Sequence, residues 1–355
     1  MTTDAAAAAR AALEGVHPEL IELSHRIYRN PELGYEEVQA AGWLADALEA
    51  AGYEVQRGYG EMATAFVAST GSGPLHVTIC AEYDALPAVG HACGHNVICT
   101  AALGAAIALK PSADALGLKV TVLGTPAEEG GGGKSPFLEA GFFEDVHASM
   151  MVHPFPTDVA EPAIIAVQQL NVEYLGRAAH ASGFPYLGIN AADAMVVAQT
   201  AIGLLRQQLL PTDRIHGFVT KGGDASNIIP ERTTAEYMVR ASTSERLDEL
   251  VGLVTDCFKA GALATGSTLE LGLDVAYKDM RHDSELAALY RRHGESFGRV
   301  FESASTPVST DMGNISHEVP SIHPMISIET NGAVNHQQEF ADACATPSAD
   351  QAIFD

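Results

Sequence analysis

Strand-like apolar runs alternate with helical segments after residue 60, and this alternation constrains the fold most strongly. An Ala-rich helical stretch at 4–50, with apolar residues at helical spacing, precedes it. The predicted strands are 64–69, 75–83, 118–129 and 147–154, and the predicted helices are 97–110 and 134–144. This pattern is typical of an α/β sheet that is covered by helices on both faces, so we expect this fold class.

A segment of different character interrupts the alternation at residues 166–278. Its predicted elements follow the order β-α-β-β-α-β, which is ferredoxin-like. The first pattern returns with a helix at 283–299 and a strand at 323–328, and the sequence shows no evident closing helix before Asp355. We therefore expect a discontinuous larger domain, 1–165 and 279–355, with domain 166–278 inserted into it.

The composition limits the partners and the compartment. Twenty basic against 45 acidic residues give a net charge of −25, which argues against nucleic acid and anionic membranes as partners. No apolar stretch approaches the length of a membrane span, and the early Asp4 does not fit a secretion signal. Five scattered cysteines do not form a disulfide framework, so a reducing cytoplasm is expected, where Cys93 stays available as a thiolate.

The hexapeptide HACGHN at 91–96 offers two metal-binding side chains, Cys93 and His95, one residue apart. In an extended or turning segment, residues i and i+2 can point to the same side, so both can bind one ion. His91 could join them by the same spacing. The alternative for this motif taken alone is a buried thiol with two surface histidines.

Adjacent carboxylates, Glu128 and Glu129, follow an apolar run and precede the glycines at 130–133. Such a pair repels unless a cation lies between its members, and the glycines allow a ligand to approach the backbone closely. The two carboxylates can have different roles, in which one binds the metal and the other acts on water as a general base. A polar turn with two solvated acids is the alternative.

Three further residues complete the candidate site. His153 ends the apolar run at 147–154; a histidine so placed is more often structural, but the Cys-x-His and Glu-Glu pairs favour metal binding. His336 lies in a polar loop, where the neighbouring residues give less reason to expect metal binding. Asp84 is well placed to be the carboxylate that orients a ligand histidine. Ligands of α/β sheets lie beyond the carboxyl ends of strands, where Asp84, Glu128 and His153 fall, so the sequence predicts a hydrolase.

These motifs, together with STDMGN, IHPMISI and NHQQEFADA, resemble the two-metal metallopeptidases and amidohydrolases of clan MH. Within the clan, the sequence is most similar to the branch of p-aminobenzoyl-glutamate hydrolase and Xaa-Arg dipeptidase. The resemblance covers almost the whole chain. It implies a zinc-exopeptidase-like catalytic domain with a mixed sheet and a ferredoxin-like lid and dimerisation domain.

The resemblance also implies residue roles in the larger domain. Glu128 would be the general base, and Asp84 would lie behind the metal site. Two divalent ions, zinc, manganese or cobalt, would be held, and a thiolate ligand favours zinc. The implied ligands are Cys93, His95, Glu129, His153 and His336. The sequence departs from many relatives at Glu82, where they carry a ligand histidine, and in its missing C-terminal helix.

In the inserted domain, the resemblance assigns His180 to the partner subunit's active site, where it would stabilise the oxyanion. Asn227 and Arg240 would bind substrate, with Arg240 holding its carboxylate, and 166–278 would form a homodimer. The expected reaction is hydrolysis of the amide bond of an N-acyl amino acid, an aminobenzoyl-glutamate-like compound or a dipeptide. An aminopeptidase and a non-catalytic metal- or ligand-binding protein on the same scaffold are the alternatives.

Overall fold

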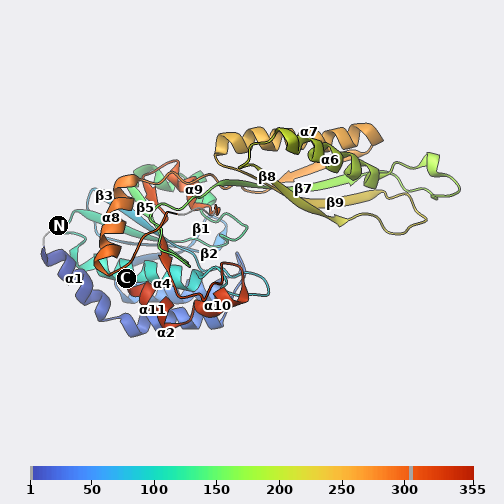
Figure 1. The fold of residues 1–355 in the computed structure, drawn as a ribbon. Helices are drawn as coiled ribbons and strands as arrows, with labels where there is room; N and C mark the ends of the chain where they lie inside the picture. Colours follow the sequence, from blue (N-terminus) through green and yellow to red (C-terminus); the bar gives the residue numbers. More distant parts are fainter. Residues whose placement is uncertain (1–2, 304–306) are drawn as a thin grey trace. The chain divides into compact units, whose positions relative to one another are not determined.

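The computed structural model describes residues 3–303 and 307–355, which form two compact units (Figure 1). Unit 1 comprises the chain up to Ala163 together with Met280–Asp355, and unit 2 comprises Ile164–Asp279.

Unit 1 is built on a six-stranded mixed sheet with the order β1-β2-β4-β3-β5-β11. β2 pairs antiparallel with both β1 and β4, while β3, β4, β5 and β11 pair in parallel. The prediction of a mixed sheet is therefore confirmed. The strands are β1 (Glu54–Tyr59), β2 (Met62–Thr70), β3 (Leu75–Ala81), β4 (Leu118–Gly124), β5 (Ala148–Met150) and β11 (Ser321–Ile322).

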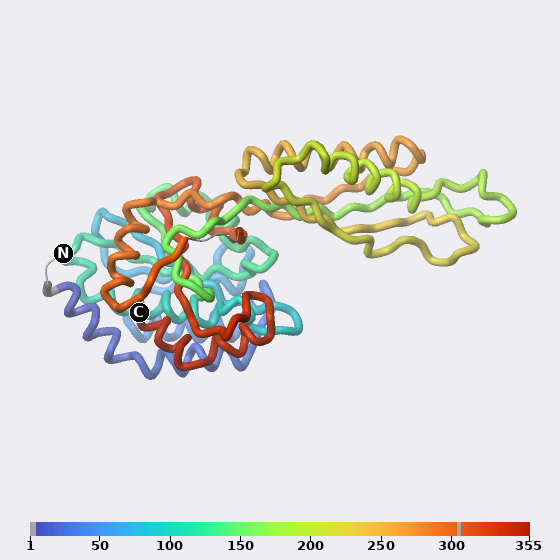
Figure 2. Tube along the Cα trace, in the orientation of Figure 1, coloured from blue at the N-terminus to red at the C-terminus, as the bar shows by residue number. Residues whose placement is uncertain are grey.

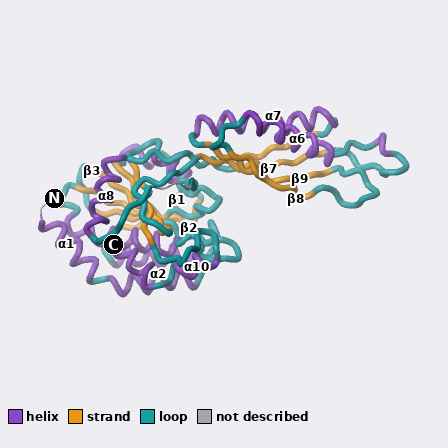
Figure 3. Tube along the Cα trace, viewed as in Figure 1, coloured by secondary structure: helices purple, strands orange, loops and turns teal. Residues whose placement is uncertain are grey.

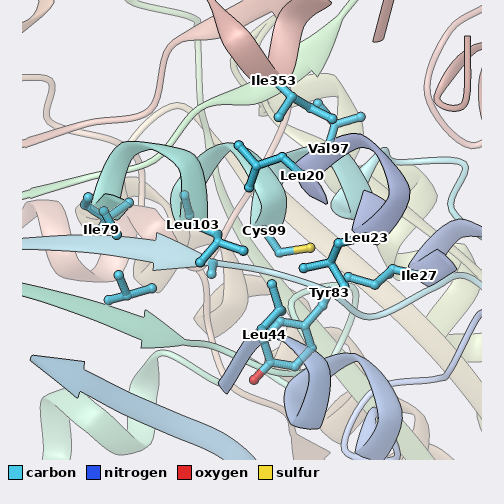
Figure 4. Packing of buried hydrophobic residues seen from close by; sticks show 14 of the residues in the cluster. Leu20, Leu23, Ile27, Leu44, Ile79, Tyr83, Val97, Cys99, Leu103 and Ile353 are labelled. Atoms are coloured by element: carbon cyan, nitrogen blue, oxygen red, sulfur yellow. The ribbon is translucent and has the colours of Figure 1, made fainter. Parts of the chain in front are cut away.

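Helices cover both faces of this sheet. Both faces need cover, because successive side chains of the buried strands point to opposite sides. Ile79 of β3 packs into the larger core, under the helices of one face, whereas its neighbour Cys80 packs into a second core on the other face. Figure 4 shows the larger core, where Leu20, Leu44 and Leu103 from three helices converge. The helices of unit 1 are α1 (Thr3–Glu14), α2 (His17–Arg29), α3 (Val38–Ala50), α4 (His95–Leu109), α5 (Ser135–Glu139), α8 (Ser284–Ser296), α9 (Met312–Ser316), α10 (Gln338–Ala343) and α11 (Pro347–Phe354).

One strand prediction and one helix prediction in the middle of the chain need correction. The single strand expected at 147–154 is two strands, because β5 ends at Met150 and β6 (His153–Phe155) pairs with β12 (Met325–Ser327) in a separate two-stranded sheet. His153 therefore begins a strand rather than ending one. The helix expected at 134–144 is α5 followed by a 3-10 turn at Phe142–Asp145, since Gly141 between them has a φ of 73°.

The expectation that no helix closes the chain is wrong. α11 begins with Pro347 in its first turn, and its Ala349, Ala352 and Ile353 are buried against the larger core. Figure 2 shows this C-terminal segment beside the N-terminal helices, and Asp350 lies 2.7 Å from the Nε2 atom of His25 in α2. The helix is short and its buried residues are mostly alanines, so its sequence lacks the row of large apolar residues that predicts a buried helix face.

Unit 2 has the predicted ferredoxin-like order, with two helices on one face of an antiparallel sheet (Figure 3). The strand order is β10-β7-β9-β8. Asn190 and Thr243 cap the two helices by accepting hydrogen bonds from backbone N–H groups, and Gly266, at a φ of 74°, ends the second. The elements are β7 (Ala166–Leu175), α6 (Ala191–Leu205), β8 (Arg214–Lys221), β9 (Arg232–Ala241), α7 (Ser244–Thr265) and β10 (Thr268–Leu273).

Short 3-10 helices complete the description, at Lys110–Ser112, Pro185–Leu187 and Arg206–Gln208. Over the described residues, no helix combines the length and the apolar character that crossing a bilayer requires.

Candidate metal centre and active site

The loop before α4 and the first residue of that helix carry Cys93 and His95 into the interior of unit 1. Gly94 between them has a φ of 79°, and a Cβ atom there would lie 2.3 Å from Cγ of Pro154. Only glycine fits this close approach, which brings the loop against the start of β6, where His153 lies. Asn96 fixes the next turn, because its amide donates hydrogen bonds to Oγ of Ser24 and the carbonyl of Cys344.

Two groups of metal-binding atoms form around Cys93. In one, the Sγ atom of Cys93 lies 3.4 Å from Nε2 of His153, and Nε2 of His95 completes the group. In the other, Nε2 of His336 lies 3.8 Å from the same sulfur and 3.6 Å from Oε2 of Glu129. The atoms of each group lie within 4.8 Å of one another, and Cys93 belongs to both. The five residues thus converge from four distant stretches of the chain.

The chemistry of these donors fits a pair of divalent cations. Nε2 of His95 and Oε1 of Glu129 are buried and have no hydrogen-bond partner, although they lie 3.9 Å apart. Burial, and then the negative charge of Glu129, raise the pKa of the Cys93 thiol well above its usual value. A cation between the donors would stabilise the thiolate and satisfy both orphaned atoms. The residues present therefore fit the ions.

Asp84 orients two of these donors at once. Its Oδ1 atom lies 2.9 Å from Nδ1 of His95, and its Oδ2 atom accepts a hydrogen bond of 3.0 Å from the N–H of Glu129. Burial alone would raise the pKa of Asp84, but the charge and hydrogen bond of His95 outweigh it and lower that pKa. Because Nδ1 of His95 is engaged, its Nε2 atom is the one turned towards the other donors.

Glu128 lies beside both groups but belongs to neither of those that contain Cys93. Its Oε2 atom is 3.8 Å from Nε2 of His95. Burial raises the pKa of this carboxyl well above its usual value, and the negative charges of Glu82, Glu129 and Asp311 raise it further. A buried carboxyl with a raised pKa next to metal-binding groups is typical of a general acid or base.

A fully buried ion cluster lies behind Glu128, and sequence reasoning did not find it. The ammonium of Lys134 lies 2.5 Å from Oε1 of Glu82 and also pairs with Oδ1 of Asp311. The free Oε2 atom of Glu82 faces Nε2 of His95 at 3.7 Å, so Glu82, His95 and Glu128 form a third group that could hold an ion. The only signals in the sequence were Glu82 close to Asp84 and the lysine directly after the glycines.

His91 takes no part in these groups. It is buried, and it is absent from every cluster of potential ligands found among the described residues. The open possibility that His91 binds metal through the H-x-C spacing is thus not supported by the structure.

The candidate residues of unit 2 lie at two ends of its sheet. His180 and Asn227 are exposed neighbours, because the β-bridge from His180 to Ile228 brings their loops together. Arg240 pairs with Val167, near the start of the unit, whereas the first residue of β9, Arg232, pairs with Leu175. Arg240 lies eight positions along β9 from Arg232, which is about 26 Å of extended chain. The chain therefore does not gather Arg240 with His180 and Asn227.

Comparisons with known proteins identify the family of this chain. Residues 167–265, within unit 2, match a family described as the peptidase dimerisation domain. The chain is 40% identical to the Xaa-Arg dipeptidase of Mus musculus over 348 residues, which is 92% of this chain and 80% of the relative. The chain belongs to the M20 peptidase family. It is also 32% identical to one of the subunits of p-aminobenzoyl-glutamate hydrolase from Escherichia coli, over 75% of this chain and 60% of that protein.

Solved structures share the M20 fold over nearly the full length. An aminobenzoyl-glutamate utilization protein from Klebsiella pneumoniae matches with a TM-score of 0.75 at 19% identity, covering 96% of each chain. A Bacillus subtilis protein described as a dinuclear metal binding peptidase from the M20 family matches with a TM-score of 0.70 at 19% identity, over 96% of this chain and 98% of that one. The predicted resemblance to this family is thus confirmed.

Proposed function

We propose that this M20 protein is a metal-dependent hydrolase that cleaves the amide bond of an N-acyl amino acid, an aminobenzoyl-glutamate-like compound or a dipeptide. One observation carries the proposal: two groups of metal-binding atoms share Cys93, and the buried carboxyl of Glu128 lies next to them. The relatives named as a dipeptidase and an aminobenzoyl-glutamate hydrolase support the choice of bond.

The ligands would be Cys93, His95, Glu129, His153 and His336, which would hold two divalent ions between them. Zinc, manganese and cobalt suit this set, and the thiolate favours zinc. When bound, such ions lower the pKa of water towards neutrality and polarise the scissile carbonyl.

Glu128 would act as the general base. It would take a proton from the attacking water and return it to the nitrogen of the leaving amine. Its raised pKa supports this role, because the carboxyl can then hold the proton between the two transfers. Asp84 would keep the ring of His95 in the orientation that the site needs.

Residues of unit 2 would complete the site in a homodimer, as the match to a peptidase dimerisation domain suggests. His180 would enter the partner subunit's site and donate a hydrogen bond to the oxyanion, with Asn227 beside it. Arg240 would bind a carboxylate of the substrate from its own end of the sheet. The separation of Arg240 from His180 supports roles in different active sites.

A panel of N-acyl amino acids, p-aminobenzoyl-glutamate and dipeptides, read by mass spectrometry, tests the reaction. We expect hydrolysis by the metal-loaded protein and none by Glu128→Gln at unchanged metal content. Blocking the amino group of a cleaved dipeptide separates the alternatives, because an aminopeptidase requires that group free and an acylase does not. Metal binding without turnover of any compound would favour the non-catalytic alternative.

Mixing two inactive variants tests the contribution of the partner subunit. Glu128→Gln and His180→Ala homodimers each lack one group in both sites. In a mixed dimer, one site has both defects and the other has neither, so activity should return. Failure to recover activity in verified mixed dimers would show that His180 acts within its own subunit, and full activity of the His180→Ala homodimer would show that it has no role.

We also propose a cytoplasmic location, which rests on the cysteines. All five are free thiols, and none forms a disulfide. A reducing compartment would keep Cys93 in the form that binds metal.

A further inference from the structure

The backbone just before Glu128 adopts a conformation that its residue type disfavours. Ala127 has a φ of 56°, in the left-handed region that non-glycine residues rarely enter. Its carbonyl accepts hydrogen bonds from the N–H groups of Gly131 and Gly132, which closes the turn that carries both carboxylates. Such a conformation persists only where surrounding contacts hold it, and residues so held cluster at functional sites.

Glu37 supplies one of those contacts from a distant part of the chain. Its side chain is fully buried at the start of α3, and its Oε1 atom accepts a hydrogen bond of 2.8 Å from the N–H of Ala127. Its Oε2 atom accepts a second bond of 2.9 Å from the hydroxyl of Thr64 in β2. The carboxylate is therefore fixed at both oxygens and cannot turn away from Ala127 without losing a bond.

The segment around Glu37 packs against the same turn and forms hydrogen bonds with it. A Cβ atom on Gly34 would lie 2.9 Å from Cβ of Ala127, and the hydroxyl of Tyr35 donates a hydrogen bond of 2.8 Å to the carbonyl of Gly131. The carbonyl of Glu32 accepts a bond of 2.8 Å from the N–H of Ala85, the residue after Asp84. Residues 32–37, which we name the brace, thus contact both loops that carry the carboxylates of the site.

We propose that Glu37 is a positioning residue for Glu128. It holds Ala127 in the left-handed conformation, which directs the Glu128 side chain towards His95. Asp84 accepts the hydrogen bond of the Glu129 N–H and also bonds the backbone of Glu128, so Glu37 adds a hold on the preceding residue, Ala127, that Asp84 does not supply. Loss of Glu37 should therefore misplace the base while leaving the metal ligands in place. The inference rests on the proposed role of Glu128 as general base.

The test compares Glu37→Ala with Glu37→Gln, and with Glu36→Ala as a control at the neighbouring exposed position. Glutamine keeps an oxygen for Ala127, and its amide can donate to the Thr64 hydroxyl. We expect Glu37→Ala to lower kcat about 10- to 100-fold, since a displacement of about 1 Å can cost that much. KM and the metal content should stay unchanged, and Glu37→Gln and Glu36→Ala should retain wild-type kcat.

Ala127→Gly adds a double-mutant cycle. Glycine adopts the left-handed conformation without strain, so the combined variant with Glu37→Ala should recover part of the lost kcat. If Glu37→Ala does not fold, Thr64→Val frees one oxygen of Glu37 and should lower kcat to a smaller extent. Unchanged kcat in the variant used, or equal losses in Glu37→Ala and Glu37→Gln, would overturn the proposal.

A crystal structure of Glu37→Ala gives a readout that does not depend on turnover. We expect Ala127 to leave the left-handed region and Glu128 to move, with Glu129 still bonded to Asp84. An unchanged turn would refute the positioning role even if the wild-type protein is active. Conversely, a displaced turn together with a wild-type protein that cleaves no compound would count against the proposed hydrolase alone.

Discussion

Replacing Lys134 by methionine should destabilise unit 1 more than any surface change. The ammonium of Lys134 is fully buried and is paired with both Glu82 and Asp311. Methionine has a similar length, so the variant removes the charge and leaves little empty space. Two carboxylates then lose their cation inside the protein, where water cannot replace it.

The size of the effect follows from that burial. Removing one partner of a buried ion pair typically costs about 3–5 kcal/mol. Because one cation serves two acids here, we expect the upper end, about 5 kcal/mol, which corresponds to about 10–20 °C in Tm for a domain of this size. Replacing Lys134 and Asp311 together, by methionine and asparagine, should recover part of this loss, since only one buried acid then lacks a cation.

The assay uses Trp43 in α3, the only tryptophan of the chain, whose fluorescence reports the unfolding of unit 1 in urea. The control is Arg29→Met in the same unit, which breaks the exposed pair with Glu22 and should cost about 1 kcal/mol at most. If Lys134→Met unfolds at the same urea concentration as this control, the reasoning about the buried cluster is wrong.

Two further predictions concern metal affinity and pH. Asp84→Asn should weaken metal binding about 10- to 100-fold, because it disturbs the orientation of His95; competition with a chelator measures this, and an unchanged affinity would contradict it. Burial and the charge of Lys119 lower the pKa of His76 from 6.5 to about 4. The unfolded chain therefore binds a proton that the folded chain does not, so stability is complete above pH 6.5 and falls towards pH 4. His76→Gln should reduce that fall in Trp43-monitored unfolding, and an identical pH dependence would exclude the assigned role of His76.

The fold class could be predicted from the sequence, because the spacing of apolar residues that marks a helix or a strand is visible within a short stretch of chain. The two helices of unit 2 and the strands β7 and β9 are long and patterned, so the ferredoxin-like order could be predicted without contacts. The pairs Cys93-x-His95 and Glu128-Glu129 were likewise recognisable, because their chemistry requires neighbours only one or two residues away. The structure brings these four residues together with His153 and His336.

Features that depend on long-range contacts could not be predicted. Asp311 lies 177 residues from Lys134, and nothing near either residue shows that they pair. Glu37 stands in the polar run PELGYEE, where an acid is ordinarily solvated, yet it is buried against Ala127. The break between β5 and β6 arises because β6 pairs with β12, a strand from the far end of the chain.

The central claim is that two divalent ions share Cys93, with Glu128 beside them as the base and not as a ligand. Anomalous diffraction from crystals of the zinc- or manganese-loaded protein tests it most directly. We predict two peaks, one bound by Cys93, His95 and His153 and the other by Cys93, Glu129 and His336. A single peak, or an ion held by Glu82, His95 and Glu128, would contradict the account, because Glu128 would then be a ligand and could not serve as the base.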